Sequence, residues 1–391
     1  MLKRITPLII LILAMPFALF AQVTTSSISG TVTGSTNEPL VGATIVAIHQ
    51  PSGTKYSTTA RAGGQFSISN MRVGGPYSIE ITFVGFQSEK QDEVYLKLAE
   101  TYLISSILKK GEGNLENVIV TTGARKNPIL NSNRTGAVTN IGRREIERLP
   151  TITRNLNDLT RATPQSNGSS VGGGNFRQNN FTIDGADFNN SFGIGNNLPA
   201  NGAPVSLDAV EEISVNVTPF DVRQSGFIGG AINAVTRAGT NKFSGSVYKY
   251  FRTEKQRGDK VEKTTFVRPI EDYKQVGFRI GGPIIKNKLF FFLNYENETQ
   301  PKTVQTRFAA TASSPFGSSP QISRATAADL QSYSSYLFNT YGYVTGGYDN
   351  YSTEITRKKI LGRIDWNINS KNRMNIRYSQ VEGGEPNPPS A

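Results

Sequence analysis

Apolar and polar residues alternate along two stretches in the last third of the chain, at 273–297 and 357–381. In each stretch, two alternating runs flank a short connection, at 283–288 in the first and at 369–372 in the second. A period of two residues predicts a β-strand with one apolar and one polar face, so each stretch is predicted to be a pair of strands joined by a tight turn. The side chains expected on the polar faces are Arg279, Asn294, Glu296, Arg363, Asp365, Asn367, Asn375 and Arg377.

The connections between the predicted strands fall into two classes of length. Two are short turns, whereas the segments 252–272 and 298–356 are long and polar. Tight turns on one side and long loops on the other are typical of a transmembrane β-barrel. With a further strand expected over 243–251, five candidate strands follow Thr240. Because such a barrel needs at least about 8 strands, we expect the chain to be the N-terminal fragment of a longer protein.

The region at 26–109 has the pattern of a small all-β module. Glycine, proline and asparagine turns separate short runs that alternate between apolar and polar residues. This spacing predicts a β-sandwich of the transthyretin or immunoglobulin type. The strands are expected at 28–32, 44–49, 65–68 and 77–83.

The region that follows mixes helical and strand patterns. A short helix is expected over 141–149, where Pro150 ends it, and another turn of helix over 156–159. Glycine-rich loops then alternate with apolar runs, which predicts a compact α+β domain. The strands are expected within 180–185, 207–215 and 229–237.

The first residues have the layout of a secretory signal peptide. Lys3 and Arg4 precede an apolar run at 8–20 that is too short to span a bilayer as a helix. Cleavage is expected after Ala21, and a signal anchor is the alternative interpretation. The predicted domains are the signal peptide at 1–21, the sandwich at 22–110, a linker at 111–127, the α+β domain at 128–240 and the first barrel strands at 241–391.

The composition leaves little room for catalysis. The chain has no cysteine, which excludes disulfides and thiol chemistry, and His49 is its only histidine. A metal site of His and Cys ligands and a Ser-His-Asp triad therefore lack their residues. The glycines at 168–174 are not followed by the Lys-Ser/Thr of a phosphate loop. We expect no catalytic residue, no metal and no cofactor, so the protein is not predicted to be an enzyme.

The net charge of +12 suggests a nucleic-acid partner only at first sight. An export signal combined with the lack of a recognition motif argues against one. Five acidic residues could form carboxylate pairs or a calcium site, although turns and helix starts are commoner places for such side chains. They are Asp184, Asp187, Asp208, Glu211 and Glu212.

Several motifs give the chain a family resemblance. They are FTIDGADFNN at 181–190, SLDAVEEI at 206–213, DVRQSGF at 221–227, AINAVTRAGTN at 231–241 and GGPIIKNKLFFF at 281–292. In this order they resemble the TonB-dependent outer-membrane receptors of the Oar-like type from the Bacteroidetes. The region at 26–109 is similar to the carboxypeptidase regulatory-like domain that such receptors carry.

The resemblance implies a plug inside a barrel, in the outer membrane of a Gram-negative bacterium, with the N-terminal domain in the periplasm. It assigns plug-motif roles to Asp184, Gly185, Asp187, Asp208 and Arg223. It also implies three partners: the periplasmic protein TonB, outer-membrane lipid and an unidentified extracellular ligand. When TonB binds it, the receptor would move its ligand with energy from the proton gradient across the inner membrane.

The same resemblance places a TonB-binding segment after the sandwich. Its residues would be Glu116, Asn117, Val118, Ile119, Val120 and Thr121. Related receptors usually have an acidic pair before the valines, whereas here Asn117 follows Glu116. A segment rich in Val, Ile and Thr can bind a partner as an added edge strand. Its alternative role is the last strand of the sandwich.

The long polar segment at 298–356 is rich in tyrosine, serine and glycine. Tyrosine on such a background supplies rigid contact area, as in binding loops, and the alternative is a solubilising loop. The ligand-contacting candidates are Tyr333, Tyr336, Tyr341, Tyr343 and Tyr348. For the protein as a whole, the alternative to a receptor is a secreted or cell-surface β-sandwich adhesin or carbohydrate-binding protein without transport.

Overall fold

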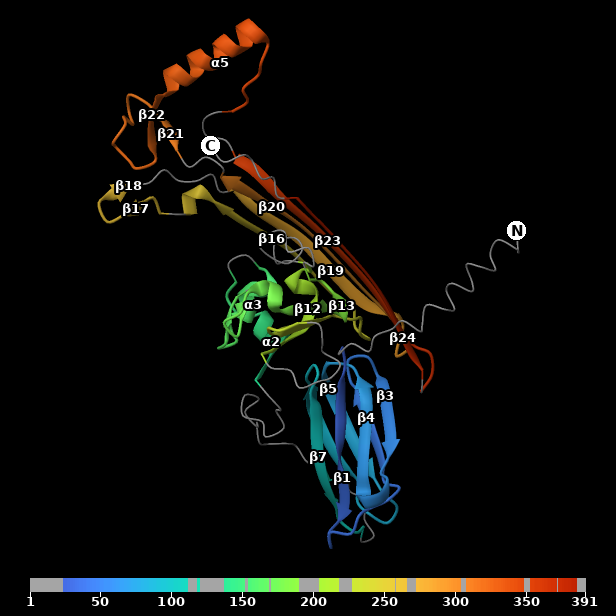
Figure 1. Cartoon of the computed structure of the whole chain (residues 1–391). Coiled ribbons are helices and arrows are strands. Elements are labelled where there is room, and N and C mark those ends of the chain that lie inside the picture. The colour runs from blue at the N-terminus through green and yellow to red at the C-terminus, as the bar shows by residue number, and fades with distance from the viewer. Residues whose placement is uncertain are drawn as a thin grey trace, which may run out of the picture. The chain divides into compact units, whose positions relative to one another are not determined.

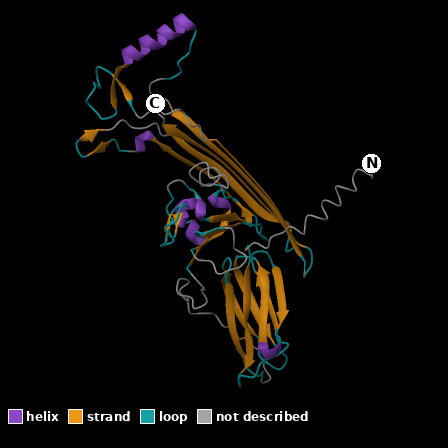
Figure 2. Cartoon of the chain, in the orientation of Figure 1, coloured by secondary structure: helices purple, strands orange, loops and turns teal. Residues whose placement is uncertain are grey.

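The computed structural model describes most of the chain beyond the first residues (Figures 1 and 2). The described residues are 24–111, 118–119, 137–151, 154–168, 170–189, 204–217, 227–256, 258–265, 272–303, 307–347, 352–370 and 372–384. The predicted signal peptide and most of the predicted linker lie outside them. Two compact units are present: the first holds residues 1–243, 281–292 and 363–376, and the second holds residues 244–280, 293–362 and 377–391.

The N-terminal part of the first unit is a sandwich of two sheets, ordered β4-β1-β7 and β3-β2-β5-β6-β8. Its elements are β1 (Ser26–Gly34), β2 (Thr44–His49), β3 (Thr54–Thr59), η2 (Ala62–Gly64), β4 (Gln65–Met71), β5 (Gly74–Thr82), β6 (Glu89–Leu96), β7 (Thr101–Leu108) and β8 (Val118–Ile119). Alternate residues such as Ile28, Ile45 and Ile79 point inward and are fully buried. The four expected strands are confirmed. The sequence reading missed β3, β6 and β7. In β3 and β6, polar and charged residues conceal the alternation.

The middle of the chain forms a sheet outside the sandwich, called here the central sheet, with the order β13-β12-β15-β14-β9. Its strands are β9 (Val138–Gly142), β12 (Asn180–Ile183), β13 (Ala186–Asp187), β14 (Val210–Asn216) and β15 (Ala231–Thr236). All six residues of β15 are buried, as expected for a strand flanked on both sides. The small elements around the sheet are α2 (Arg143–Ile146), α3 (Leu156–Thr160), β10 (Ser166–Asn167), β11 (Ser170–Val171), η3 (Phe176–Gln178) and η4 (Leu207–Ala209).

The helix expected over 141–149 is wrong at both ends. Ile141 and Gly142 belong to β9 and pair with β14, so the helix is only four residues long. The Gly142 N–H donates to the Glu145 carboxylate at 2.6 Å, which caps the helix start and ends the strand. Tertiary pairing with β14 therefore decides this boundary.

The last part of the chain forms another sheet, called here the long-strand sheet, with the order β16-β19-β20-β23-β24. It confirms all five expected strands. Its strands are β16 (Ser244–Thr253), β19 (Asp272–Ile285), β20 (Leu289–Thr303), β23 (Ser352–Asn367) and β24 (Arg373–Gly384). The turn between β19 and β20 is shorter than expected, because the strand continues through residues 283–285. Asn287, with φ of 61°, takes the left-handed conformation that this turn needs.

The two faces of the long-strand sheet have an inverted polarity. Apolar side chains on one face are 37–60% exposed: Val276, Phe278, Ile280, Leu293, Ile360, Ile364, Trp366, Ile368, Met374, Ile376 and Tyr378. Polar side chains on the other face are at most 7% exposed: Gln275, Asn294, Glu296, Glu298, Arg357, Lys359 and Arg363. On β23 the outward apolar residues run from Ile360 to Trp366, about 20 Å of strand. A row of outward apolar side chains is typical of a strand that crosses an outer membrane.

The segment expected to be a long loop at 298–356 is wrong in part, because it contains a helix. The elements of the connecting segments are η5 (Glu254–Gln256), β17 (Lys260–Val261), β18 (Thr264–Thr265), β21 (Phe308–Ala310), β22 (Ile322–Thr326) and α5 (Ala327–Tyr341). The Thr326 hydroxyl accepts from the Asp329 N–H at 3.1 Å, and Gly342 ends α5 with φ of 66°. No residue of α5 is buried. Its half-buried residues Ala327, Leu330, Ser334 and Leu337 recur at helical spacing, a signal that the sequence reading missed.

Among the residues described, no helix combines the length and the apolar content needed to cross a membrane.

Candidate functional site

A tight turn after β12 presents the carboxylate of Asp184 to the end of the neighbouring strand β15. Asp184 and Gly185 both have positive φ, 49° and 85°, which reverses the chain into β13. The Asp184 carboxylate accepts the Thr236 N–H at 2.9 Å and the Thr236 hydroxyl. Aspartate suits this position because it tolerates the left-handed conformation and accepts hydrogen bonds from nearby backbone. The turn thus fixes the last residue of β15.

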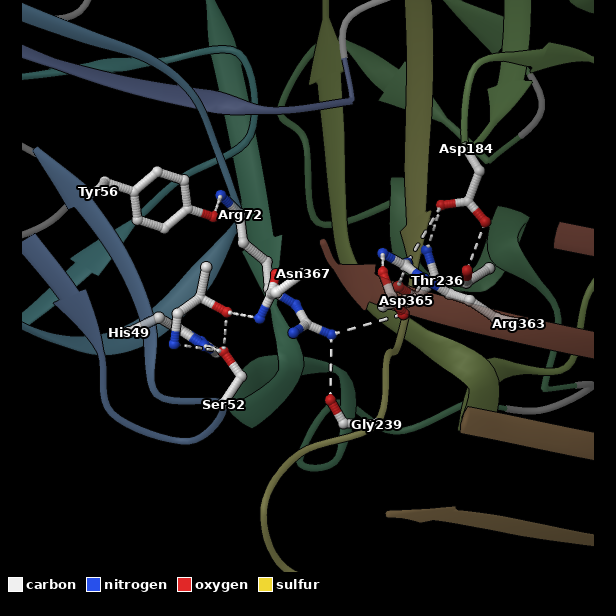
Figure 3. Close-up of polar contacts among 11 residues, drawn as sticks. His49, Ser52, Tyr56, Arg72, Asp184, Thr236, Gly239, Arg363, Asp365 and Asn367 are labelled. Atoms are coloured by element: carbon white, nitrogen blue, oxygen red, sulfur yellow. Dashed lines mark hydrogen bonds and ion pairs between the residues drawn. The ribbon is translucent and has the colours of Figure 1, made fainter. Parts of the chain in front are cut away.

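Arg363, on β23 of the long-strand sheet, reaches this same point (Figure 3). Its Nη1 donates to the Thr236 carbonyl at 2.7 Å and lies 4.0 Å from Asp184 Oδ1. Its Nε and Nη2 each donate to the Asp365 carboxylate at 2.8 Å, in a bidentate pair. The side chain is only 6% exposed. A buried guanidinium satisfied in this way joins the central sheet to the long-strand sheet.

The sequence analysis identifies the residues on both sides of this junction, but it does not predict that they are in contact. Asp184 and Gly185 were assigned to a plug motif, and Arg363 and Asp365 to the polar face of a strand. The other motif residues have local roles: Asp187 accepts the Asn189 N–H at 2.7 Å, and Asp208 lies in η4. Arg223 lies outside the described residues.

A ladder of charges lies on the polar face of the second unit. Lys359 Nζ is 2.5 Å from Glu296 and 3.6 Å from Glu298, and Arg357 Nη1 is 2.5 Å from Glu298. Burying a charge is costly unless it is paired, and these side chains pair across strands β20 and β23. The sequence reading named Glu296 but missed Arg357 and Lys359. Arg357 and Lys359 stand two positions apart on the polar face, but Lys358 between them is also charged, which conceals the alternation.

The segment assigned to TonB lies at the edge of the sandwich where the structure describes it. Val118 and Ile119 form β8, which pairs in parallel with Glu89 and Lys90 of β6. Glu116, Asn117, Val120 and Thr121 lie outside the described residues. The two described residues therefore occupy the alternative position, as the last strand of a sandwich sheet.

The tyrosines assigned to ligand binding lie on and after α5. Tyr333, Tyr336 and Tyr341 belong to the helix, Tyr343 follows it, and all four are at least half exposed. The rings of Tyr336 and Tyr341 meet edge to face with centroids 6.2 Å apart. Tyr348 lies outside the described residues. The helix gathers three of the five candidates on one element.

Two buried titratable groups lie away from the Arg363 junction. Burial lowers the pKa of His49 to about 3, and its Nδ1 lies 2.7 Å from the Ser52 hydroxyl. Burial raises the pKa of Glu212 to about 8, although its carboxylate accepts the Leu98 N–H at 2.8 Å. Within the described part of the chain, no group of three or more histidine, cysteine, aspartate or glutamate side chains could hold a metal ion.

Two family models match separate parts of the chain. Residues 27–108 match the carboxypeptidase regulatory-like domain, and residues 235–391 match an outer membrane beta barrel domain. A TonB-dependent transporter, Oar of Myxococcus xanthus, is 25% identical over 299 residues, which is 71% of this chain and 27% of that protein. The chain thus spans about a quarter of the length of this relative.

Solved structures of two siderophore receptors are similar to part of this chain. The siderophore receptor PirA from Acinetobacter baumannii is 19% identical, with a TM-score of 0.41 over 63% of this chain and 32% of that one. The siderophore receptor PirA from Pseudomonas aeruginosa is 15% identical, with a TM-score of 0.39 over 64% of this chain and 36% of that one.

Proposed function

We propose that this chain, a member of the TonB-dependent outer-membrane receptors with an N-terminal carboxypeptidase regulatory-like domain, forms the gating part of an active transporter. In this proposal residues 128–240 are the plug, residues 241–391 begin the barrel wall, and residues 22–110 lie in the periplasm. TonB binds the segment 116–121 and pulls on the plug, which opens a path for the ligand.

The observation that carries this proposal is the junction at Arg363. A side chain from a wall strand holds the end of β15 by one charged hydrogen bond and one ion pair, at 2.7 and 4.0 Å. A hydrogen bond to a charged group contributes about 1.5–3 kcal/mol. Such a polar contact is specific enough to keep the plug closed and weak enough to break under a pull. A gate needs both properties.

The ligand would be captured outside the cell by the segment that contains α5. Its tyrosines are exposed on a rigid element, and aromatic side chains held in this way supply contact area at a low entropic cost. In the binding step the ligand would meet Tyr333, Tyr336, Tyr341 and Tyr343. The class of ligand is not specified by these residues.

The junction can be tested with Arg363→Met in the complete receptor. Losing a contact of about 1.5 kcal/mol or more should raise the open fraction of the plug at least about tenfold. We expect cells to become several times more sensitive to a large antibiotic that the outer membrane normally excludes. Lys358→Met is the matched control, because Lys358 lies on the same strand with its side chain exposed on the opposite face.

Heat-modifiable migration on gels would verify that both variants assemble in the outer membrane. An Arg363→Met receptor that assembles and excludes the antibiotic as well as the control does would contradict the gating role.

A further inference from the structure

The segment 237–243, called here the hinge, connects the last central strand, β15, to the first long strand, β16. Two hydrogen bonds join it to the sandwich. The Arg72 Nη2 donates to the Gly239 carbonyl at 3.3 Å, and the Asn241 N–H donates to the Pro51 carbonyl at 2.8 Å. Arg72 also lies 3.9 Å from the Asp365 carboxylate, which is the partner of Arg363 (Figure 3). Arg72 thus reaches both the hinge and the plug junction.

Arg72 is held in place from inside the sandwich. Its N–H donates to the Tyr56 hydroxyl at 3.2 Å, and its carbonyl accepts the Tyr77 hydroxyl at 2.6 Å. Tyr56 and Tyr77 are both buried in the sandwich core. Because two core side chains fix its backbone, Arg72 loses only side-chain freedom when it binds the hinge.

The sandwich also contacts the turn between β23 and β24. Asn367 Nδ2 donates to the Thr54 hydroxyl at 3.0 Å, and Arg373 Nη2 donates to the Lys55 carbonyl at 2.7 Å. The Arg373 guanidinium lies 3.9 Å from the centre of the Tyr56 ring, in a cation–π contact. These contacts come from consecutive residues of β3, so they form one continuous surface.

The buried His49 supports this surface. Its ring lies 2.7 Å from the Ser52 hydroxyl, which in turn lies 2.7 Å from the Thr54 hydroxyl (Figure 3). The chain of hydrogen bonds orients Thr54 toward Asn367. In this chain of hydrogen bonds His49 acts as a positioning residue for Thr54, which is a different role from metal binding or catalysis.

We propose that the carboxypeptidase regulatory-like domain is a fixed brace for the plug–barrel hinge and does not move freely on a tether. Arg72 is its positioning residue. The surface that does this is formed by Pro51, Thr54, Lys55, Tyr56 and Arg72. Its consequence for gating rests on the proposed function. With the hinge held, the end of β15, the middle strand of the central sheet, stays in place, so the plug would begin to rearrange at the edge strand β9, which lies beyond β14.

The Asn241 amide offers a direct measurement, because its N–H is bonded to the sandwich itself. We expect Arg72→Ala in the complete receptor to speed hydrogen exchange in the peptide that covers 237–243 at least about tenfold. Arg61→Ala is the matched control, since Arg61 belongs to the same domain and its side chain is exposed. Arg72→Lys should restore exchange only in part, because a single ammonium lacks the guanidinium's fork. Exchange in Arg72→Ala equal to that in the control would overturn the brace.

A second measurement leaves Arg72 intact. Residues 1–391 contain no cysteine, so Thr54→Cys and Asn367→Cys form the one pair of thiols within them. Mild oxidation of the receptor in membranes should link them within minutes, whereas Ser67→Cys with Asn367→Cys should stay unlinked because Ser67 lies on the exposed face of β4. Failure of the first pair to link would overturn the proposal. Neither measurement involves TonB or a ligand. The brace proposal can therefore be contradicted while the proposed function stands, and the proposed function can be contradicted while the brace proposal stands.

Discussion

Arg363 and Asp184 illustrate how few residues would join the plug to the wall in the proposed receptor. Each has a second partner of its own: Arg363 has Asp365, and Asp184 has Thr236. Breaking the contact between them therefore leaves neither charge unpaired. Since an unpaired buried charge costs several kcal/mol, the spare partners lower the cost of separating them. This arrangement supports the reversible gating that we propose.

Glu212 leads to a prediction about pH. Burial raises the pKa of its carboxyl to about 8, against 4.5 for the unfolded chain, and the nearby Glu211 acts in the same direction. Between these values the folded state keeps a proton that the unfolded state releases. Stability should therefore fall as pH rises through this window, by up to about 1.4 kcal/mol per pH unit.

We expect Glu212→Gln, which is neutral at every pH, to flatten this dependence and to be more stable than the wild type above pH 8. The first transition in calorimetry, recorded from pH 5 to pH 9, measures the effect. The matched control is Glu93→Gln, since Glu93 is exposed on β6. A wild-type profile that is flat over this range would show that the Glu212 proton is not retained.

At the scale of elements, the strands of the long-strand sheet follow their sequence pattern closely. Outward residues such as Ile360 and Ile364 are apolar, and inward residues such as Lys359 and Arg363 are charged. A soluble sandwich buries its apolar face, as the N-terminal domain does with Ile45 and Ile79. The same period of two thus places apolar side chains inward in the sandwich and outward in the long-strand sheet. Apolar side chains are stable on an outer face when that face contacts lipid, whereas contact with water is unfavourable for them.

The short strand β8 supports a second prediction. The backbone groups that pair Val118 and Ile119 with β6 are those that an edge strand would offer to TonB. Val118→Pro removes a backbone donor and should weaken binding of the periplasmic domain of TonB to the receptor by about tenfold, equivalent to roughly one hydrogen bond. Binding can be followed by surface immobilisation of that domain.

The control for this variant is Gly113→Pro, a substitution in the same linker outside the proposed segment. Equal binding by Val118→Pro and Gly113→Pro would place the TonB contact elsewhere in the chain.

At the scale of the whole molecule, the sandwich carries a core of its own. All the members of its buried cluster lie between Ile28 and Leu108. We therefore expect residues 24–111 to fold alone with one cooperative urea transition. Ile79→Ala, at a fully buried site, should cost about 2–5 kcal/mol. Ile107→Ala, at a site that is 61% exposed, should change stability by less than about 0.5 kcal/mol. A transition equally sensitive to both would mean that the core does not form in isolation.

The sequence by itself determined the strands and the polarity of their faces. Alternation is a local property, so β19, β20, β23 and β24 could be read directly, as could β2 in the sandwich. Boundaries set by capping or pairing could not: Ile141 joins β9 only because β14 lies beside it. In α5 the helical spacing of Leu330 and Leu337 is present in the sequence, but the polar composition of the segment favours a loop.

Only the tertiary structure brought together residues that are far apart in the chain. Asp184 and Arg363 are 179 positions apart, and Arg72 and Asp365 are 293 apart, from their residue numbers. No local pattern encodes such contacts, because each side chain on its own resembles an ordinary turn or surface residue. Folding turns them into a junction, since contact depends on the path of the whole chain and not on the period of any segment.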